Sequence, residues 1–201
     1  MNFSSKLLEN AVNEMSQLPG IGKRTALRLV LFLLQQPNSQ TKELSDSLNK
    51  LIENVILCKN CHNISDSELC EICSNNKRNK SIICVVEDIA DQWSVENSNI
   101  YKGYFHILGG TISSPGQRKE DLLLNSLAER VVKDNIEEVI IATSATVEGQ
   151  TTAYYIQDIL KKKNVKVTKL AQGLPVGGEI ENLDDGTLFS AFKNRTGIKG
   201  S

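Results

Sequence analysis

The chain has 201 residues, of which 40% are hydrophobic and 23% charged, and its formal net charge is −1. These values are typical of a soluble globular protein with one ordinary domain or two small ones, and they exclude a bulk electrostatic attraction to nucleic acid or membrane. The most apolar run, residues 26–34, is too short to span a bilayer and contains Arg28. Glu9 and Asn10 interrupt the apolar residues at the start of the chain, so we recognise no secretion signal and expect a cytoplasmic protein.

The first part of the chain, residues 1–56, predicts a helical region. Apolar residues recur at helical spacing in three stretches: before Pro19, from Gly22 to about Pro37, and from Thr41 to Val55. Pro19 and Gly20 end the first helix, and Gly22 permits a tight turn before the second.

The turn PGIG, at residues 19–22, is the first feature along the chain that suggests a binding function. In a helix-hairpin-helix, two glycines at this spacing let the backbone approach a phosphate, and the amides at the start of the next helix point at the anion. Lys23, Arg24 and Arg28 follow at once and add positive charge. Such contacts read the DNA backbone and carry no sequence information. The alternative is a plain turn between two core helices, with solvated basic residues.

Four of the five cysteines form the pattern C-x2-C-x8-C-x2-C, namely Cys58, Cys61, Cys70 and Cys73. Two C-x-x-C turns supply the four sulfurs of a tetrahedral zinc site, and four thiolates leave no open position, so the site is expected to be structural. The alternative is a pair of disulfides or a dithiol redox pair. The expected reducing compartment and the doubling of the motif both disfavour it. His62 lies inside the motif but is not needed as a ligand. The fifth cysteine, Cys84, lies in an apolar run and is expected to be a small core residue.

From residue 81 the sequence predicts an α/β domain. Strands are expected at 81–87, 104–108, 138–143 and 166–171, and helices at 88–96, 122–134 and 148–163. This alternation predicts a parallel sheet covered by helices, with ligand groups at the carboxyl ends of the strands. A short helix is expected at 187–195, followed by a loose tail.

Three acids lie at those strand ends. Glu87 closes the first strand, Asp88 follows it, and Glu148 precedes a helix. Together with a substrate phosphate they would suit Mg²⁺, but spacing alone favours a simpler interpretation, in which Asp88 caps one helix and Glu148 stabilises the start of another.

The order of these motifs, ending in ATSATVEG and GLPVGGE, resembles the RecR family of bacterial recombination mediators over nearly the whole chain. The resemblance implies an α+β chain of several parts: a helix-hairpin-helix region (1–56), a four-cysteine zinc finger (57–74), a Toprim domain (81–176) and a C-terminal oligomerisation segment with its tail (177–201). Carried over by position, the DNA-contacting residues are Gly20, Gly22, Lys23, Arg24 and Arg28. The zinc ligands are Cys58, Cys61, Cys70 and Cys73, one ion per chain. The Toprim residues are Glu87, Asp88, Glu148 and Gly149.

The resemblance also implies partners. Family members form homo-oligomers, in this family a ring-like tetramer able to surround DNA, and work at the nucleoid with RecO, and in many bacteria RecF, to load RecA onto single-stranded DNA. The chain departs from the family at Gln150, where many members have a glutamate.

Two other function classes remain open. In a catalytic Toprim nuclease, primase or topoisomerase, a glutamate after the first strand is combined with an Asp-x-Asp pair after a later strand. This chain has TSATVEG in place of the Asp-x-Asp pair, so we expect no enzyme activity. Mg²⁺ at the Toprim acids is correspondingly disfavoured. A zinc-dependent scaffold that binds only proteins would make the basic residues after PGIG dispensable for nucleic-acid binding.

Overall fold

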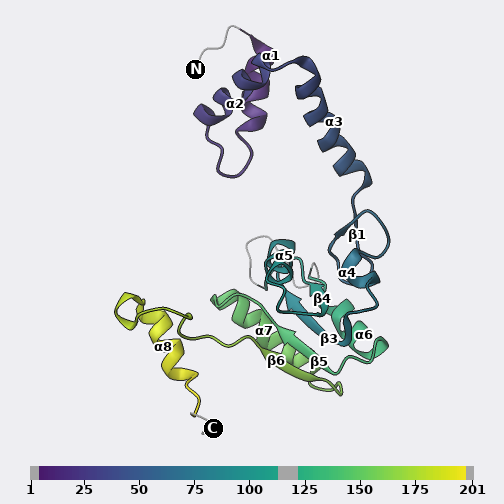
Figure 1. The fold of residues 1–201 in the computed structure, drawn as a ribbon, viewed down its shortest axis with the longest axis vertical. Coiled ribbons are helices and arrows are strands. Elements are labelled where there is room, and N and C mark those ends of the chain that lie inside the picture. Colours follow the sequence, from purple (N-terminus) through teal and green to yellow (C-terminus); the bar gives the residue numbers. More distant parts are fainter. Residues whose placement is uncertain (1–4, 113–121, 198–201) are drawn as a thin grey trace. The chain divides into compact units, whose positions relative to one another are not determined.

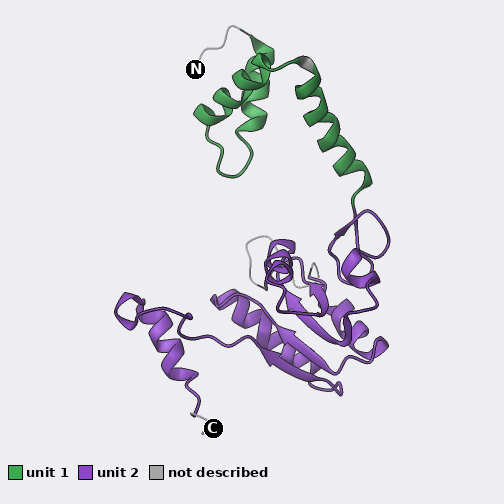
Figure 2. Cartoon of the chain, in the orientation of Figure 1, with its two compact units in different colours: residues 1–55 green, residues 56–201 purple. Residues whose placement is uncertain are grey.

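The computed structural model of the chain describes residues 5–112 and 122–197. These residues belong to two units, a helical unit (residues 1–55) and an α/β unit (residues 56–201), shown in green and purple in Figure 2. In the described residues no helix is both long enough and apolar enough to cross a membrane.

The helical unit contains α1 (Lys6–Met15), α2 (Lys23–Gln35) and α3 (Asn38–Asn54). Val12 of α1 packs against Ala26 and Val30 of α2, and all three are buried. α3 begins three residues earlier than the sequence predicts, directly after Pro37, whose fixed φ suits a helix start. Thr41 therefore lies inside the helix, and its hydroxyl donates to the carbonyl oxygen of Leu33 in α2 at 3.0 Å.

The cysteine loop (residues 56–74) opens the α/β unit. It holds a two-residue antiparallel pair, β1 (Ile56–Leu57) with β2 (Ile64–Ser65), and one turn of helix, α4 (Glu71–Ser74). The sequence pattern does not predict these short elements, because two residues are too few for a periodic signal.

A four-stranded sheet follows, made of β3 (Asn79–Val86), β4 (Gly103–Ile107), β5 (Glu138–Ile141) and β6 (Lys166–Lys169). The order is β4-β3-β5-β6 and every pair is parallel, as predicted (Figure 1). The continuous apolar run in β3 is buried from Ile83 to Val86, because the sheet is covered on both faces.

Three helices cover the sheet: α5 (Ile89–Asn97), α6 (Leu124–Lys133) and α7 (Val147–Leu160). α6 and α7 pack on one face, where Leu127 and Ile156 meet Ile83. α5 packs on the other, where Val95 meets Cys84. The chain continues through a short 3-10 turn, η2 (Ile180–Asn182), to α8 (Asp185–Lys193), which starts two residues before the predicted helix because Asp184 caps it.

Candidate functional site

The turn at residues 19–22 has the geometry of a type II turn. Pro19 is its second residue, and Gly20 has a φ of 78°, which only glycine adopts without strain. The amide of Ile21 closes the turn on the carbonyl of Leu18 at 3.0 Å. The chain's own conformation therefore requires Gly20.

Gly22 has no such internal requirement. Its φ is −78°, which any residue adopts, and a Cβ built on it would meet no atom within 4 Å. Gly22 is the residue before α2, and no side chain of the described residues caps this helix. The start of α2 therefore has no side-chain cap in the described residues and is preceded by a residue with no side chain. That is the geometry in which a helix start receives an anion.

The basic cluster, Lys23, Arg24 and Arg28, lies on α2 and is exposed throughout. No ion pair in the described part of the chain involves any of the three, so their charge is not offset by neighbouring carboxylates. α2 also lacks an acidic residue in its first turn. The start of α2 is therefore positive in both its dipole and its side chains.

The four cysteines of the cysteine loop converge on one point. Their sulfurs all lie within 4.8 Å of one another, and all four residues are buried. Tetrahedral zinc holds sulfur at about 2.3 Å, which places the sulfurs roughly 3.8 Å apart, so this cluster fits the ion with a small adjustment. No disulfide is present, since all five cysteines are free. Cys58, Cys61, Cys70 and Cys73 thus form the site of a structural zinc.

The thiols compete for protons when no metal is bound. Cys61 Sγ lies 3.4 Å from Cys70 Sγ, and hydrogen bonding within the cluster holds the pKa of Cys70 well below its usual range. The same bonds, together with burial, raise the pKa of Cys61 and of Cys73. The amide of Cys70 also donates to Cys58 Sγ at 3.3 Å, which offsets negative charge on this sulfur. Outside the cluster, burial raises the pKa of Cys84 to about 12 and keeps it an inert core residue.

The cysteine loop docks on the edge strand β4. The amide of Ile107 donates to the carbonyl of Cys61 at 2.9 Å, and the hydroxyl of Tyr104 donates to the carbonyl of Cys73 at 3.4 Å. Ile72 of the loop packs against the apolar clusters on both faces of the sheet. The metal site is therefore built into the α/β unit and covers an edge that would otherwise be open to pairing.

His62 is not a member of the metal cluster, as the four-cysteine pattern predicts. It has another role. Its φ is 65°, and its Nε2 lies 3.2 Å from the hydroxyl of Ser126 on α6. Its ring also meets that of His106 edge-on, with centroids 5.1 Å apart. No local pattern indicates these contacts, because their partners lie more than forty residues away.

The Toprim residues lie around the start of α7. Glu87 directly follows β3, and its carboxylate accepts a hydrogen bond of 2.7 Å from the amide of Ser144, in the loop after β5. A Cβ on Gly149 would collide with the backbone carbonyl and hydroxyl of Ser144 and would lie 2.9 Å from Glu87 Oε1. Glu148 is exposed in the first turn of α7. Glu87 and Gly149 thus share a closely packed contact, and Glu148 lies outside it.

Asp88 caps α5. Its carboxylate accepts from the amide of Asp91 at 2.9 Å, and the Asp91 carboxylate accepts from the amide of Asp88 at 3.4 Å, which together form a capping box. The simpler of the two interpretations of Asp88 is confirmed.

Gln150, where the sequence departs from the family pattern, donates from Nε2 to the carbonyl of Ala145 at 3.0 Å. A glutamate has no donor for this bond, so the glutamine closes the loop between β5 and α7 in a way that the acid does not.

Comparison with protein families matches the whole arrangement. The model described as "RecR, helix-hairpin-helix" matches residues 8–52, and the model of the RecR four-cysteine zinc finger domain matches residues 55–75. Those described as "Toprim domain" and "RecR, C-terminal" match residues 81–171 and 173–196.

Individual relatives match over nearly their full lengths. The chain is 65% identical to "Recombination protein RecR" of Pelagibacter ubique, over 96% of this chain and 95% of the relative. It is 50% identical to the protein of the same name from Flavobacterium psychrophilum (100% and 98%) and 40% identical to that from Orientia tsutsugamushi (97% of each). With relatives of this name up to 65% identical over nearly the whole chain, and family models of RecR matched in its helix-hairpin-helix, zinc finger and C-terminal parts, the chain belongs to the RecR family.

Proposed function

We propose that this chain is a non-catalytic, DNA-binding recombination mediator that acts in the cytoplasm at the nucleoid. It works with RecO, and with RecF where that protein is present, to load RecA onto single-stranded DNA at gaps. In this proposal residues 1–56 grip DNA and residues 57–74 hold zinc. Residues 81–176 form the Toprim domain, and residues 177–201 take part in oligomerisation.

The DNA-binding part of the proposal is supported by the structure at the start of α2. Within the described residues, no atom lies near the space that a side chain at Gly22 would fill, the helix start has no side-chain cap, and Lys23, Arg24 and Arg28 are exposed and unpaired. A phosphate accounts for all three observations at once. Contacts of this kind bind single- and double-stranded DNA without regard to sequence.

Assembly into a ring, such as the family's tetramer, would make weak contacts effective. A single hairpin contacts few phosphates, and several linked hairpins on one DNA molecule gain avidity without new contacts. α3 supports self-association, because Leu44, Leu48, Leu51 and Ile52 are all about half exposed or more. A row of apolar side chains on one helix is typical of an interaction face.

The Toprim domain supports a non-catalytic role. The residues after β5 are Ala142, Thr143, Ser144 and Ala145, where a catalytic Toprim enzyme would need two aspartates. Glu87 already accepts a hydrogen bond from the backbone of this loop. We propose that Glu87, Asp88, Glu148 and Gly149 shape this region for protein contacts or for the fold, and not for metal-dependent phosphoryl chemistry.

Loading of RecA tests this proposal directly. The proposal implies that, on single-stranded DNA coated with its binding protein, DNA-dependent ATP hydrolysis by RecA begins only after a lag. Adding the chain together with RecO is expected to shorten this lag, and the Lys23→Ala, Arg24→Ala, Arg28→Ala variant is expected not to. If the lag stays unchanged with the wild-type chain, the mediator function is wrong. If the variant shortens the lag as well as wild type, the chain acts as a scaffold and does not grip DNA.

A further inference from the structure

A cavity of about 520 Å³ lies between the cysteine loop and α5 within the α/β unit. Its walls come from two segments that are distant in sequence, residues 63–74 and residues 92–97. Nothing in the proposed DNA contact uses this part of the α/β unit.

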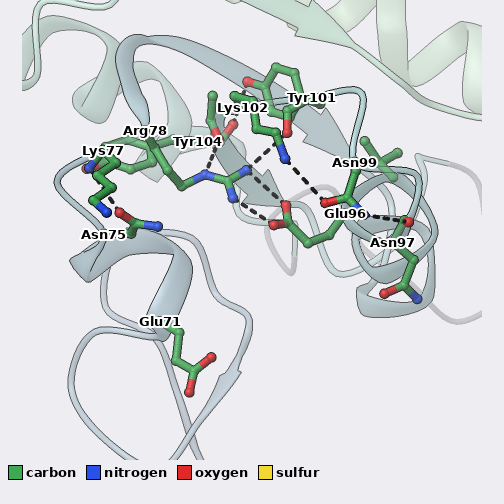
Figure 3. Close-up of polar contacts among 12 residues, drawn as sticks. Glu71, Asn75, Lys77, Arg78, Glu96, Asn97, Asn99, Tyr101, Lys102 and Tyr104 are labelled. Atoms are coloured by element: carbon green, nitrogen blue, oxygen red, sulfur yellow. Dashed lines mark hydrogen bonds and ion pairs between the residues drawn. The ribbon is translucent and has the colours of Figure 1, made fainter.

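The cavity is acidic. Asp66 and Glu71, on the loop side, are exposed and take part in no ion pair within the described residues. Glu96, on the α5 side, is already neutralised, because the guanidinium of Arg78 binds both of its oxygens, at 2.7 and 2.9 Å. Figure 3 shows this pair, with Glu71 pointing away from it. Two carboxylates therefore remain available to a cation.

The cavity also offers apolar and aromatic surface. Ile64 and Leu69 project from the loop side, each about two fifths exposed, and Trp93 projects from α5 with 53% of its surface exposed. An exposed tryptophan beside unpaired carboxylates suits lysine or arginine, since the indole face attracts a cation and the carboxylates pair with it.

Gln92 supplies an independent observation. It lines the same cavity and is 1% exposed, yet neither its Nε2 nor its Oε1 has a hydrogen-bond partner among the described residues. A buried amide with both polar atoms unsatisfied is costly to the folded state. A peptide group entering the cavity would supply the missing acceptor and donor together, after a rotation of the carboxamide toward it.

From the unpaired carboxylates, the exposed tryptophan and the unsatisfied glutamine in one cavity, we infer that this groove binds a lysine- or arginine-containing extended segment of another protein. Its cation contacts Trp93 and pairs with Asp66 or Glu71. Its apolar neighbours lie on Ile64 and Leu69, and its backbone satisfies Gln92. DNA is excluded as the occupant because its phosphates would face two carboxylates.

The test starts from random twelve-residue peptides displayed on phage and selected on the zinc-loaded full-length protein. The recovered peptides are expected to be enriched in lysine or arginine next to apolar residues. Recovery of no peptide above background, or of peptides without basic residues, would overturn the inference. Peptides that match a stretch of this chain would assign the groove to a second copy of it and would also overturn the inference.

The best synthetic peptide is then titrated by fluorescence anisotropy. Asp66→Lys and Trp93→Ala are each expected to weaken its binding roughly tenfold, as loss of a desolvated charge or aromatic contact does. The control is Glu68→Lys, which reverses one charge on the same loop but outside the cavity. Its effect is expected to stay within about twofold, as for a charge at the rim of an interface. Equal losses in all three variants would show a general charge effect and contradict the proposed groove.

Gln92→Leu separates recognition from folding. Because this substitution removes an unsatisfied amide, we expect the melting temperature of the free protein to stay unchanged or to rise. We expect the variant to bind the peptide more weakly than wild type does. If Gln92→Leu binds the peptide as tightly as wild type does, Gln92 is not part of the binding site.

Discussion

The guanidinium of Arg130, on α6, donates a hydrogen bond of 2.8 Å to the backbone carbonyl of Asn60, in the cysteine loop. The same nitrogen donates to the carbonyl of Phe105 in β4 at 2.7 Å, and Nε pairs with Asp134 at 3.2 Å. The side chain is 7% exposed. One buried cation thus joins a helix, the edge strand and the metal-binding loop, and it holds the loop where the four sulfurs can meet.

Replacing Arg130 with methionine is expected to lower the free energy of unfolding by about 2–3 kcal/mol, because two buried carbonyls lose a charged donor. Zinc is expected to leave the variant faster when a chelator is added. Urea denaturation and chelator-dye kinetics measure the two effects. The control is Lys133→Met, an exposed position on the same helix. If the two variants have equal urea midpoints, Arg130 does not hold the loop.

Gly149→Ala is expected to destabilise the protein by about 2–3 kcal/mol, since a Cβ there collides with Ser144, whose backbone carries the contact to Glu87. Gly22→Ala, in open space at the start of α2, is expected to cost at most about 1 kcal/mol, the scale of a helix-cap change. Thermal unfolding of both variants checks the difference. If Gly22→Ala lowered the melting temperature more than Gly149→Ala does, the close packing around Gly149 would not be the stronger constraint.

The sequence predicts those parts of this structure that depend on local patterns. The C-x-x-C pairs indicate the metal site, the apolar runs indicate buried strands, and PGIG indicates the turn. Arg130 and His62 could not be found this way. From the sequence alone, Arg130 would be interpreted as a solvated residue near the end of a helix. Its hydrogen-bond partners depend on how α6 packs on β4. Gln92 reads as a polar residue on a surface helix. It is buried in the folded unit, and this burial depends on tertiary packing that residue spacing does not specify.

Zinc binding is expected to release protons. Without metal, the pKa values of Cys61 and Cys73 are raised, so both thiols carry protons at neutral pH, and thiolate ligands must lose them. The apparent zinc affinity should therefore fall as pH falls. Calorimetric titration at pH 7 in buffers of different ionisation enthalpy counts the protons released. A binding enthalpy that is the same in every buffer would contradict this account.

His106 is expected to make the fold acid-sensitive. It is fully buried, and burial lowers its pKa to about 3, so the folded state resists protonation that the unfolded state accepts below a pKa of about 6.5. Stability from this group is complete at pH 7 and is lost as pH falls below 6.5, by about 2 kcal/mol at pH 5.

His106→Gln keeps a donor for the carbonyl of Leu123, which His106 Nε2 contacts at 2.8 Å, but it does not titrate. Its free energy of unfolding, measured by urea denaturation, should change less between pH 7 and pH 5 than that of wild type. Parallel curves would mean that another group causes the acid sensitivity.

The most direct measurement for the central claim is fluorescence anisotropy of labelled single-stranded DNA across a salt series. Wild type is compared with the Lys23→Ala, Arg24→Ala, Arg28→Ala variant and with a control that removes the same charge elsewhere, Lys161→Ala, Lys162→Ala, Lys163→Ala. All three proteins are first checked for zinc content and assembly. The account predicts that the first variant binds more weakly and that its salt slope falls by about 0.7 for each phosphate that it no longer neutralises, while the control keeps both affinity and slope. Equal affinity and slope for the first variant and wild type would show that the start of α2 does not hold DNA.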